Sequence, residues 1–324
     1  MTEMLCENAE TKLRNRAQYW HQLYTRFLKD EKKKKSWKLR AVCYHPWPLL
    51  FNRVMVFFEY GVADRIFEKN RLDLKAKTVL DVGCGAGRWC EYFWAKGAKV
   101  IGADLVPELL AENQKSYSQC DFLAMSAAPL ACRSDLLDFI NAAIVLEYVP
   151  NSRKPEVIRE FFRVLRPGGC ALILDPVAGA DYREGESSSL MKPGEWRELF
   201  IRNGFEIMDQ RWLHAYPLTR LYKAFMAWIA RIVKWIKGSR KANMARTSPA
   251  GSGGGCAPPV KVLKTRHQFY HAADQMVLRV IACFSFPLEF LWLALGREGS
   301  HLMFLIRKKT DAQKMKEGGF EGNC

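Results

Sequence analysis

The amino-acid sequence predicts an α/β fold in which helices cover a doubly wound, mostly parallel sheet. Residues 78–82 form a short apolar run with one acid, and such runs are typical of strands buried on both faces of a sheet. Alternate glycines follow at once, at Gly83, Gly85 and Gly87, and residues 88–94 then have the pattern of a helix. Glycine permits a positive φ and a close approach of the backbone to a ligand. This succession indicates a nucleotide-type site at the carboxyl end of a strand.

Later segments repeat the alternation of strand and helix. Lys99–Asp104 is a second buried run, and it ends in an acid 23 residues beyond Asp81. Ile140–Val149 predicts another strand and the turn after it. Val157–Gly169 predicts an amphipathic helix that stops at Pro-Gly-Gly, and Cys170–Asp175 predicts the strand that follows. Such alternation favours a parallel sheet.

The glycine turn differs from the G-x-G-x-x-G pattern of dinucleotide-binding proteins, because its glycines run G-x-G-x-G and an acid precedes them. The segment Asp81–Gly87 fits E/D-x-G-x-G-x-G at every fixed position. It thereby resembles the first motif of the class I S-adenosylmethionine-dependent methyltransferases, including the type 11-like group. Leu165–Gly169, LRPGG, resembles another recurrent segment of that family. The resemblance implies the family's seven-stranded, Rossmann-like sheet, whose seventh strand is antiparallel.

The same resemblance implies S-adenosylmethionine as the cofactor. Asp104 lies where the family's acid accepts hydrogen bonds from both ribose hydroxyls. Many relatives carry a further acid for the adenine amino group, whereas this chain has Ala124–Ser126 near that place. We expect Ser126 to accept that hydrogen bond and Met125 to lie against the adenine, unless backbone groups do this work. The residues expected to bind the cofactor are Asp81, Gly83, Cys84, Gly85, Gly87, Asp104, Leu105, Met125 and Ser126.

The turn after the Ile140–Val149 strand supplies the candidate catalytic residues. It reads LEYVP and resembles the LEHVP of quinone-pathway and other small-molecule O- and C-methyltransferases, with Tyr148 in place of histidine. Glu147 or Tyr148 is expected to be the polar group near the methyl; the alternative is that Glu147 only caps the helix starting near Pro155. Six scattered histidines show no metal-ligand spacing, so no metal is expected. The chain lacks an Asn/Asp-Pro-Pro-Tyr/Phe run here, which disfavours methylation of amino groups on bases or glutamine.

The net charge of +16 is confined to two parts of the 324-residue chain. Residues 1–40 carry 11 Lys and Arg against 5 Asp and Glu, residues 214–300 carry 13 against 3, and the remainder is neutral. We therefore expect these two parts to contact something anionic. Ten cysteines lack C-x-x-C and zinc spacing, and the acidic N-terminus does not resemble a secretory signal, so a reducing, cytoplasmic location is expected.

The end of the sheet is interrupted in the sequence. Phe205–Leu213 fits the sixth strand and His301–Lys308 the seventh, so about 87 residues form an insertion between them. So long a connection is unusual in a compact domain unless it has a use. Upstream, Trp47–Asn70 predicts the helix that precedes the first strand and covers the cofactor in this family. The expected parts are a basic helical extension at 1–70, a core at 71–213 and 301–310, the helical insertion at 214–300, and a tail at 311–324.

The insertion combines apolar helical segments with a flexible, Gly- and Ser-rich loop at 238–259. Leu218–Lys237 has no acid and carries Trp228 and Trp235 on a broad apolar face, which is typical of binding at a membrane surface. A cap helix packed on its own domain is the alternative. Gln275–Gly296 is apolar, but its uncharged runs are too short to span a bilayer. An interfacial segment or a lid over an apolar substrate fits it better.

The favoured function is methyl transfer to a small or apolar acceptor, lipid- or quinone-like, at an anionic membrane surface. Two alternatives stay open. Parts of the chain around Pro129 also resemble the tRNA wobble-uridine methyltransferases, in which case the basic segments would contact RNA phosphates. The other alternative is a cofactor-binding scaffold without activity. Interleaving of the basic residues with Trp, Phe and Ile favours a membrane over RNA.

Overall fold

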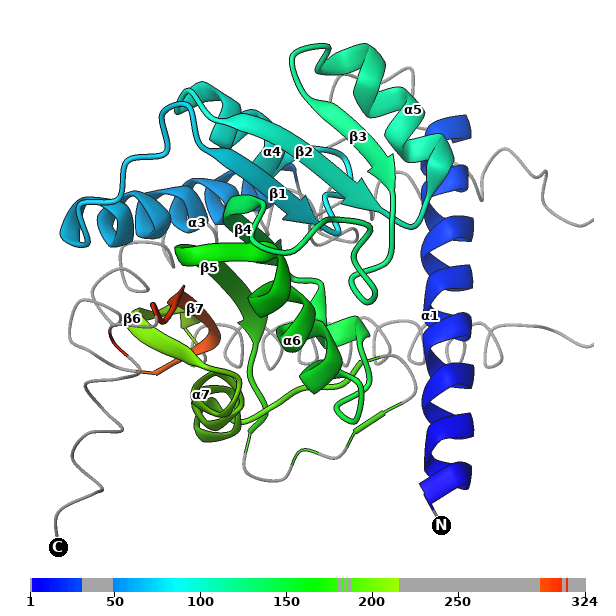
Figure 1. The fold of residues 1–324 in the computed structure, drawn as a ribbon. Helices are drawn as coiled ribbons and strands as arrows, with labels where there is room; N and C mark the ends of the chain where they lie inside the picture. The colour runs from blue at the N-terminus through cyan, green and yellow to red at the C-terminus, as the bar shows by residue number, and fades with distance from the viewer. Residues whose placement is uncertain are drawn as a thin grey trace, which may run out of the picture. The chain divides into compact units, whose positions relative to one another are not determined.

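Seven strands form one sheet in the order β3-β2-β1-β4-β5-β7-β6 (Figure 1). The structure is a computed structural model, and it describes residues 2–30, 49–179, 182, 184–185, 188–215, 298–310 and 313. Neighbours from β3 to β5 run parallel, and β7 runs antiparallel to β5, which confirms the predicted mixed, doubly wound sheet. The strands are β1 (Thr78–Val82), β2 (Lys99–Asp104), β3 (Asp121–Ala124), β4 (Leu137–Ala143), β5 (Leu165–Pro176), β6 (Phe205–Ala215) and β7 (Gly299–Lys308).

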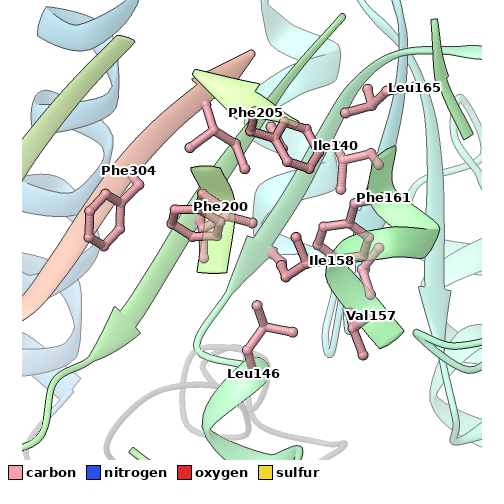
Figure 2. Close-up of a cluster of buried hydrophobic side chains, with 14 of the residues drawn as sticks. Ile140, Leu146, Val157, Ile158, Phe161, Leu165, Phe200, Phe205 and Phe304 are labelled. Atoms are coloured by element: carbon pink, nitrogen blue, oxygen red, sulfur yellow. The ribbon is translucent and has the colours of Figure 1, made fainter. Parts of the chain in front are cut away.

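Side chains along each central strand alternate between two hydrophobic clusters, one on each face of the sheet. In β5, Ala171 and Ile173 belong to one cluster, and Leu172 and Leu174 belong to the other. Both faces are therefore covered, which explains why these strands read as nearly continuous apolar runs. Helices α6 (Lys154–Val164) and α7 (Pro193–Arg202) close the first face, where Figure 2 shows their phenylalanines against the sheet. Helices α3 (Leu49–Lys69), α4 (Arg88–Ala95) and α5 (Pro107–Ser116) close the second.

Proline and glycine fix the starts of the helices that cover the sheet. α4 begins after Gly87, whose φ is +80°. α5 begins at Pro107 and α7 at Pro193, where the fixed φ of proline suits the first helical position and its missing N–H leaves no donor unsatisfied. At α7 the Lys192 N–H also donates to Glu195 at 2.7 Å, as in a capping box. The turns from β1 to α4 and from β2 to α5 are therefore short.

The N-terminal helix α1 spans Thr2–Asp30, longer than the periodicity of residues 8–28 predicts. It lies beside α5 and is drawn in dark blue in Figure 1. Tyr24 packs in a third cluster with Ala86, Val106 and Leu109. These contacts attach α1 to the turns after β1 and β2.

Several strand boundaries differ from the prediction, and the largest difference is at the start of β5. β5 begins at Leu165 rather than Cys170, because Leu165 pairs with Leu137 before the register shifts. The Pro-Gly-Gly segment thus lies inside an irregular part of the strand, and Gly168 takes a φ of +78° there. β7 lies between β5 and β6 as expected.

The backbone divides into two units, residues 1–213 with 300–324 and residues 214–299. The cavity described below belongs to the first unit. The predicted insertion segments 218–237, 238–259 and 275–296 lie outside the described residues, and so do the four consecutive lysines at 32–35 in the basic N-terminal part. Within the described part of the chain, no helix is long and apolar enough to cross a membrane.

Candidate functional site

A cavity of about 480 Å³ opens at the carboxyl ends of the parallel strands. The chain runs outward from β1 to β2 on one side, and it returns to β4 on the other, so the strand order reverses between β1 and β4. Open α/β sheets bind ligands at this switch point. Each wall segment follows one strand or belongs to α1. The lining includes residues 82–85, 104–106, 125–127, 143–145 and 147–149, with Leu13, Arg16, Ala17, Trp20, Tyr24, Arg88, Trp89, Pro176 and His301.

The glycine loop, residues 83–87, needs glycine for both conformation and space. Gly83, Gly85 and Gly87 have φ values of +64°, +53° and +80°. A Cβ on Gly83 would lie 2.4 Å from Cγ2 of Val145, and one on Gly87 would lie 2.7 Å from the ring of Tyr117. The three glycines therefore let the loop press against the turn after β4 and against α5. The fit of a nucleoside ligand at this loop needs that close backbone approach.

Asp104 lies at the end of β2 and lines the cavity. The Gly85 N–H donates to its Oδ2 at 3.0 Å, and the Val106 N–H donates to its Oδ1 at 3.1 Å. Burial raises the pKa of this carboxyl, while the backbone donors oppose that rise. Each carboxylate oxygen keeps a second lone pair, so Asp104 can accept two further hydrogen bonds, as the two hydroxyls of a ribose would require.

Asp81 lies behind the glycine loop rather than in the cavity wall. It is 1% exposed, and the Asn141 side chain donates to its Oδ1 at 2.7 Å. The Cys90 thiol donates to its Oδ2 at 3.2 Å. Burial raises the pKa of Asp81 to about 6. Its side chain thus connects β1 to β4 and to α4. Asp81 was expected to bind the cofactor, but it is not among the described residues that line the cavity.

The segment after β3 brings Met125 and Ser126 to the cavity. Met125 is buried, and its sulfur accepts a hydrogen bond from the Ala131 N–H. The Ser126 hydroxyl donates to Ala128 O at 3.0 Å and accepts from the Ala128 N–H, so its local partners compete with an adenine amino group. Leu105 is 56% exposed beside the cavity, and Cys84 is a buried thiol in its wall.

Glu147 and Tyr148 lie in a short 3₁₀ turn, Leu146–Tyr148, that follows β4 and borders the cavity. Glu147 does not cap α6, whose N-cap is Arg153 and has no side-chain capping bond. Instead its carboxyl is hydrogen-bonded to Tyr148, and burial raises its pKa while Lys154 and Arg16 oppose the rise. Burial also raises the pKa of Tyr148 far above its ordinary value. A carboxyl with this environment is suited to accept a proton.

The backbone just before this turn is strained. Ile144 has a φ of +58°, a conformation that is rare for a β-branched residue. Its N–H donates to Leu174 O at 2.6 Å, and its side chain lines the cavity. Strain of this kind concentrates at functional sites, because the surrounding structure must hold it.

Helix α1 supplies one wall of the cavity. Among the described residues, α1 lines the cavity and α3 does not, although Trp47–Asn70 was expected to cover the cofactor. α3 stands one layer behind, where Glu59 pairs with Arg88 at 2.6 Å. Leu13, Ala17, Trp20 and Tyr24 recur every three or four positions on one face of α1. That periodicity is visible in the sequence, but nothing in it says which surface the face meets.

Arg16 fastens α1 over the cavity. This arginine is 4% exposed, and its guanidinium donates to Tyr148 O at 3.2 Å, to Ser189 Oγ at 3.0 Å and to Gly185 O at 2.9 Å. The Trp20 ring also meets the Tyr148 ring edge to face, with centroids 4.9 Å apart. Helix α1, the Glu147 turn and the segment after β5 are therefore held as one wall.

No group of three or more His, Cys, Asp and Glu side chains is arranged to hold a metal ion within the described ranges. Leu13, Ala17, Trp20 and Tyr24 make the α1 side of the cavity wall mainly apolar and aromatic, while the carboxylates of the wall are Asp104 and Glu147. This distribution suits a ligand with a polar nucleoside end and an apolar partner beside it.

Comparison with known proteins gives matches over the same region. A family described as a methyltransferase domain matches residues 79–169, which include the glycine loop, Asp104 and Glu147. A ubiquinone biosynthesis O-methyltransferase of Xanthomonas oryzae pv. oryzae (strain PXO99A) is 38% identical over 104 residues, or 31% of this chain. This chain spans only 43% of that relative's length.

Two further proteins resemble more of the chain. A ubiquinone biosynthesis O-methyltransferase of Pseudomonas putida (strain W619) is 30% identical over 175 residues, which are 47% of this chain and 75% of the relative. A solved structure from Galdieria sulphuraria, assigned as a sarcosine dimethylglycine methyltransferase, has a TM-score of 0.49 and 17% identity. It covers 80% of this chain and 88% of its own.

Proposed function

Because the chain belongs to the class I S-adenosylmethionine-dependent methyltransferases, we propose that it methylates a hydroxyl oxygen of an apolar, ring-bearing acceptor. The observation that carries this proposal is the position of Glu147, which borders the same cavity as the glycine loop and Asp104. A proton acceptor and a nucleoside site thus face one space. The relatives named as ubiquinone biosynthesis O-methyltransferases support a quinol-like acceptor.

The residues of the glycine loop and Asp104 fit S-adenosylmethionine. The loop has no room for side chains at Gly83 and Gly87, and Asp104 retains two acceptor positions for ribose hydroxyls. Met125 and Leu105 offer apolar surface beside the adenine position. When bound, the cofactor supplies an electrophilic methyl group, whose bond to the sulfonium breaks as its bond to the acceptor oxygen forms.

The protein's part in the reaction is to hold the acceptor and to take its proton. The Glu147 carboxylate receives the hydroxyl proton as the oxygen becomes bonded to carbon, and it later returns that proton to water. Burial raises the pKa of Glu147, while Lys154 and Arg16 oppose the rise, so the carboxylate is a stronger base than that of an exposed glutamate. The remaining rate enhancement comes from holding the acceptor and the cofactor next to each other in the cavity that α1 borders.

The shape and chemistry of the acceptor side favour a flat, apolar ring. Trp20, Tyr24 and Tyr148 present aromatic surface, and Leu13 and Val149 add aliphatic surface. Aromatic side chains contribute large apolar contact area and favour edge-to-face or offset contact with another ring. A small, strongly charged acceptor would leave these surfaces unused.

The test is methyl transfer to a panel of acceptors by purified full-length protein, followed as formation of S-adenosylhomocysteine. We expect turnover with catechol- or quinol-type rings, greater with an apolar tail, and a loss of about 10²- to 10⁴-fold in kcat for Glu147→Gln. Glu156→Gln, a change at a half-exposed carboxyl on α6, is the matched control. Full turnover by Glu147→Gln would overturn the role of this residue. No turnover with any acceptor, despite cofactor binding, would favour the scaffold alternative.

We also propose that the enzyme acts at an anionic membrane surface, and the support for this comes from the sequence. The positive charge is confined to residues 1–40 and 214–300, and the basic segment 218–237 carries Trp228 and Trp235. Each Lys or Arg near an anionic leaflet contributes about 1 kcal/mol, and buried apolar surface adds to this. A cytoplasmic protein that binds a leaflet reversibly would meet a lipid-like acceptor there.

Flotation with anionic liposomes, run beside a tRNA gel shift, tests the membrane proposal. The wild type is expected to float with the liposomes, and Trp228→Ser with Trp235→Ser to stay in solution, because the apolar contribution is lost. Purely electrostatic binding to RNA would hardly respond to that double change. Tight tRNA binding without liposome capture would contradict the proposal and favour an RNA acceptor.

A further inference from the structure

A cluster of charged side chains, in which Arg16, Lys154 and Asp175 are buried, lies next to the turn that carries Glu147. Ser189 makes hydrogen bonds to several of its members. Ser189 is fully buried. Its N–H donates to Glu147 O at 2.7 Å, and its carbonyl accepts from the Lys154 ammonium at 2.6 Å. Its hydroxyl accepts from Arg16 at 3.0 Å and donates to the carboxylate of Glu184. One serine therefore links α1, α6, the segment after β5 and the Glu147 turn.

Lys154 is an unusual residue at its position. It is the first residue of α6, where a lysine would ordinarily reach solvent, yet it is 0% exposed. Its ammonium lies 4.8 Å from the ring centroid of Trp196. Burying an ammonium costs several kcal/mol unless opposite charges and hydrogen bonds compensate. One carbonyl and one ring do not supply that compensation, so nearby carboxylates must.

Asp175 is the carboxylate whose charge acts most strongly on Lys154. It lies one residue before the end of β5 and is 2% exposed. Its Oδ1 accepts from the Glu147 N–H at 3.4 Å. The positive charge of Lys154 and the backbone N–H groups of Glu147 and Val145 favour the ionised form of this carboxyl. Asp175 thereby touches the backbone of the residue whose side chain faces the cavity.

We propose that Lys154 and Asp175 are positioning residues that set the protonation state of Glu147 from opposite sides. The positive charge of Lys154 keeps Glu147 ionised and ready to take a proton, and the negative charge of Asp175 makes Glu147 more basic. Neither side chain lines the cavity, so both act through Glu147. This inference rests on the proposed role of Glu147 as the proton acceptor.

The charge balance of the cluster supports this assignment. Three carboxyl groups, Glu147, Asp175 and Glu184, share two cations, Arg16 and Lys154. Burial disfavours the charged forms of both Asp175 and Lys154, raising the pKa of Asp175 and lowering that of Lys154 to about 8, and the attraction between the two opposes both shifts and favours the charged pair. The titratable or charged groups that face Glu147 or its turn are Tyr148 on the turn itself, Arg16 and Tyr24 on α1, Lys154 on α6, Asp175 on β5, Glu184 after β5, and His301 on β7.

Carboxyl ¹³C NMR of the full chain saturated with S-adenosylhomocysteine tests the proposal without turnover. The resonance of Glu147 is assigned by its loss in Glu147→Gln, and its pKa is read from a pH titration. Lys154→Met is expected to raise that pKa by about one unit or more, because an opposite charge is lost. Asp175→Asn is expected to lower it by a similar amount, because a like charge is lost.

Two further variants separate electrostatics from structural damage. Lys154→Arg keeps the charge and is expected to restore the wild-type titration. Lys154→Met with Asp175→Asn removes both charges, so the pKa of Glu147 is expected to return close to the wild-type value even where the single Lys154 change unfolds the protein. Shifts of the two single variants in the same direction, or a double variant that keeps a large shift, would overturn the proposal. Full turnover by Glu147→Gln in the acceptor assay would refute the proton role itself and leave these titrations readable.

Discussion

Replacing Gly83 with alanine should destabilise the protein, because the added methyl group would clash with the side chain of Val145 in the turn after β4. Gly83 has a φ of +64°, and an L-residue in the left-handed region costs about 1–2 kcal/mol. The added Cβ would lie 2.4 Å from Cγ2 and 2.8 Å from Cγ1 of Val145. Overpacking of this kind costs typically about 1–3 kcal/mol. We therefore expect Gly83→Ala to lower the free energy of unfolding by about 2–5 kcal/mol.

Urea unfolding followed by circular dichroism measures this change, and two variants serve as controls. Gly61→Ala lies in helix α3, where nothing approaches an added Cβ within 4 Å, so it should stabilise by about 0.5–1 kcal/mol. The double variant Gly83→Ala with Val145→Ala removes the two shortest contacts but keeps the positive φ. It should therefore be more stable by about 1–3 kcal/mol than the sum of the two single effects predicts. A Gly83→Ala protein as stable as the wild type would refute the packing of the glycine loop against the turn after β4.

Three further outcomes follow from the site. The pKa of Asp81 is about 6 in the folded protein and about 3.9 when unfolded, so the folded state binds the extra proton between these values. The resulting stabilisation is complete below pH 4 and is lost as pH rises through 6. Asp81→Asn lacks this proton, so the unfolding free energy of the variant minus that of the wild type should increase by about 3 kcal/mol between pH 4 and pH 7 in urea titrations. A difference that does not change with pH would contradict the raised pKa of Asp81. Trp20→Ala should raise the KM for the acceptor about tenfold with little change in S-adenosylhomocysteine affinity in steady-state and calorimetric assays, since an aromatic wall is lost. Arg16→Met removes three hydrogen bonds from a buried guanidinium, so amides of α1 should exchange with deuterium faster while those of β1 and β4 do not; unchanged exchange would mean that Arg16 does not fasten α1.

The sheet and the cofactor side of the cavity were predictable because their signals are local. A glycine loop directly after a buried strand needs no knowledge of distant residues, and Asp104 follows from its spacing to that loop. Glu147 was found in the same way, from the turn that follows β4. The sequence does not show that the Asp81 carboxylate bonds Asn141 and Cys90 instead of lining the cavity, because a motif does not tell in which direction a side chain points.

The acceptor side was not predictable, because its residues meet only through tertiary structure. Arg16 and Ser189 are 173 positions apart and share a hydrogen bond. Lys154 reads as an ordinary surface lysine at a helix start, and its burial is visible only once α7 places Trp196 beside it. Hydrophobic periodicity reveals that α1 has an apolar face, yet it does not reveal the surface on which that face packs.

Calorimetric titration of the full chain with S-adenosylhomocysteine tests the central claim, that the glycine loop and Asp104 hold this nucleoside. We predict saturable binding to one site in the wild type. Asp104→Asn should weaken it by about 1.5–3 kcal/mol, or roughly 10- to 150-fold, because hydrogen bonds to a charged acceptor are lost. Asp121→Asn, an exposed acid at the start of β3, should bind as the wild type does. No heat of binding with folded wild-type protein, or equal affinity in Asp104→Asn, would contradict the assignment of the cavity.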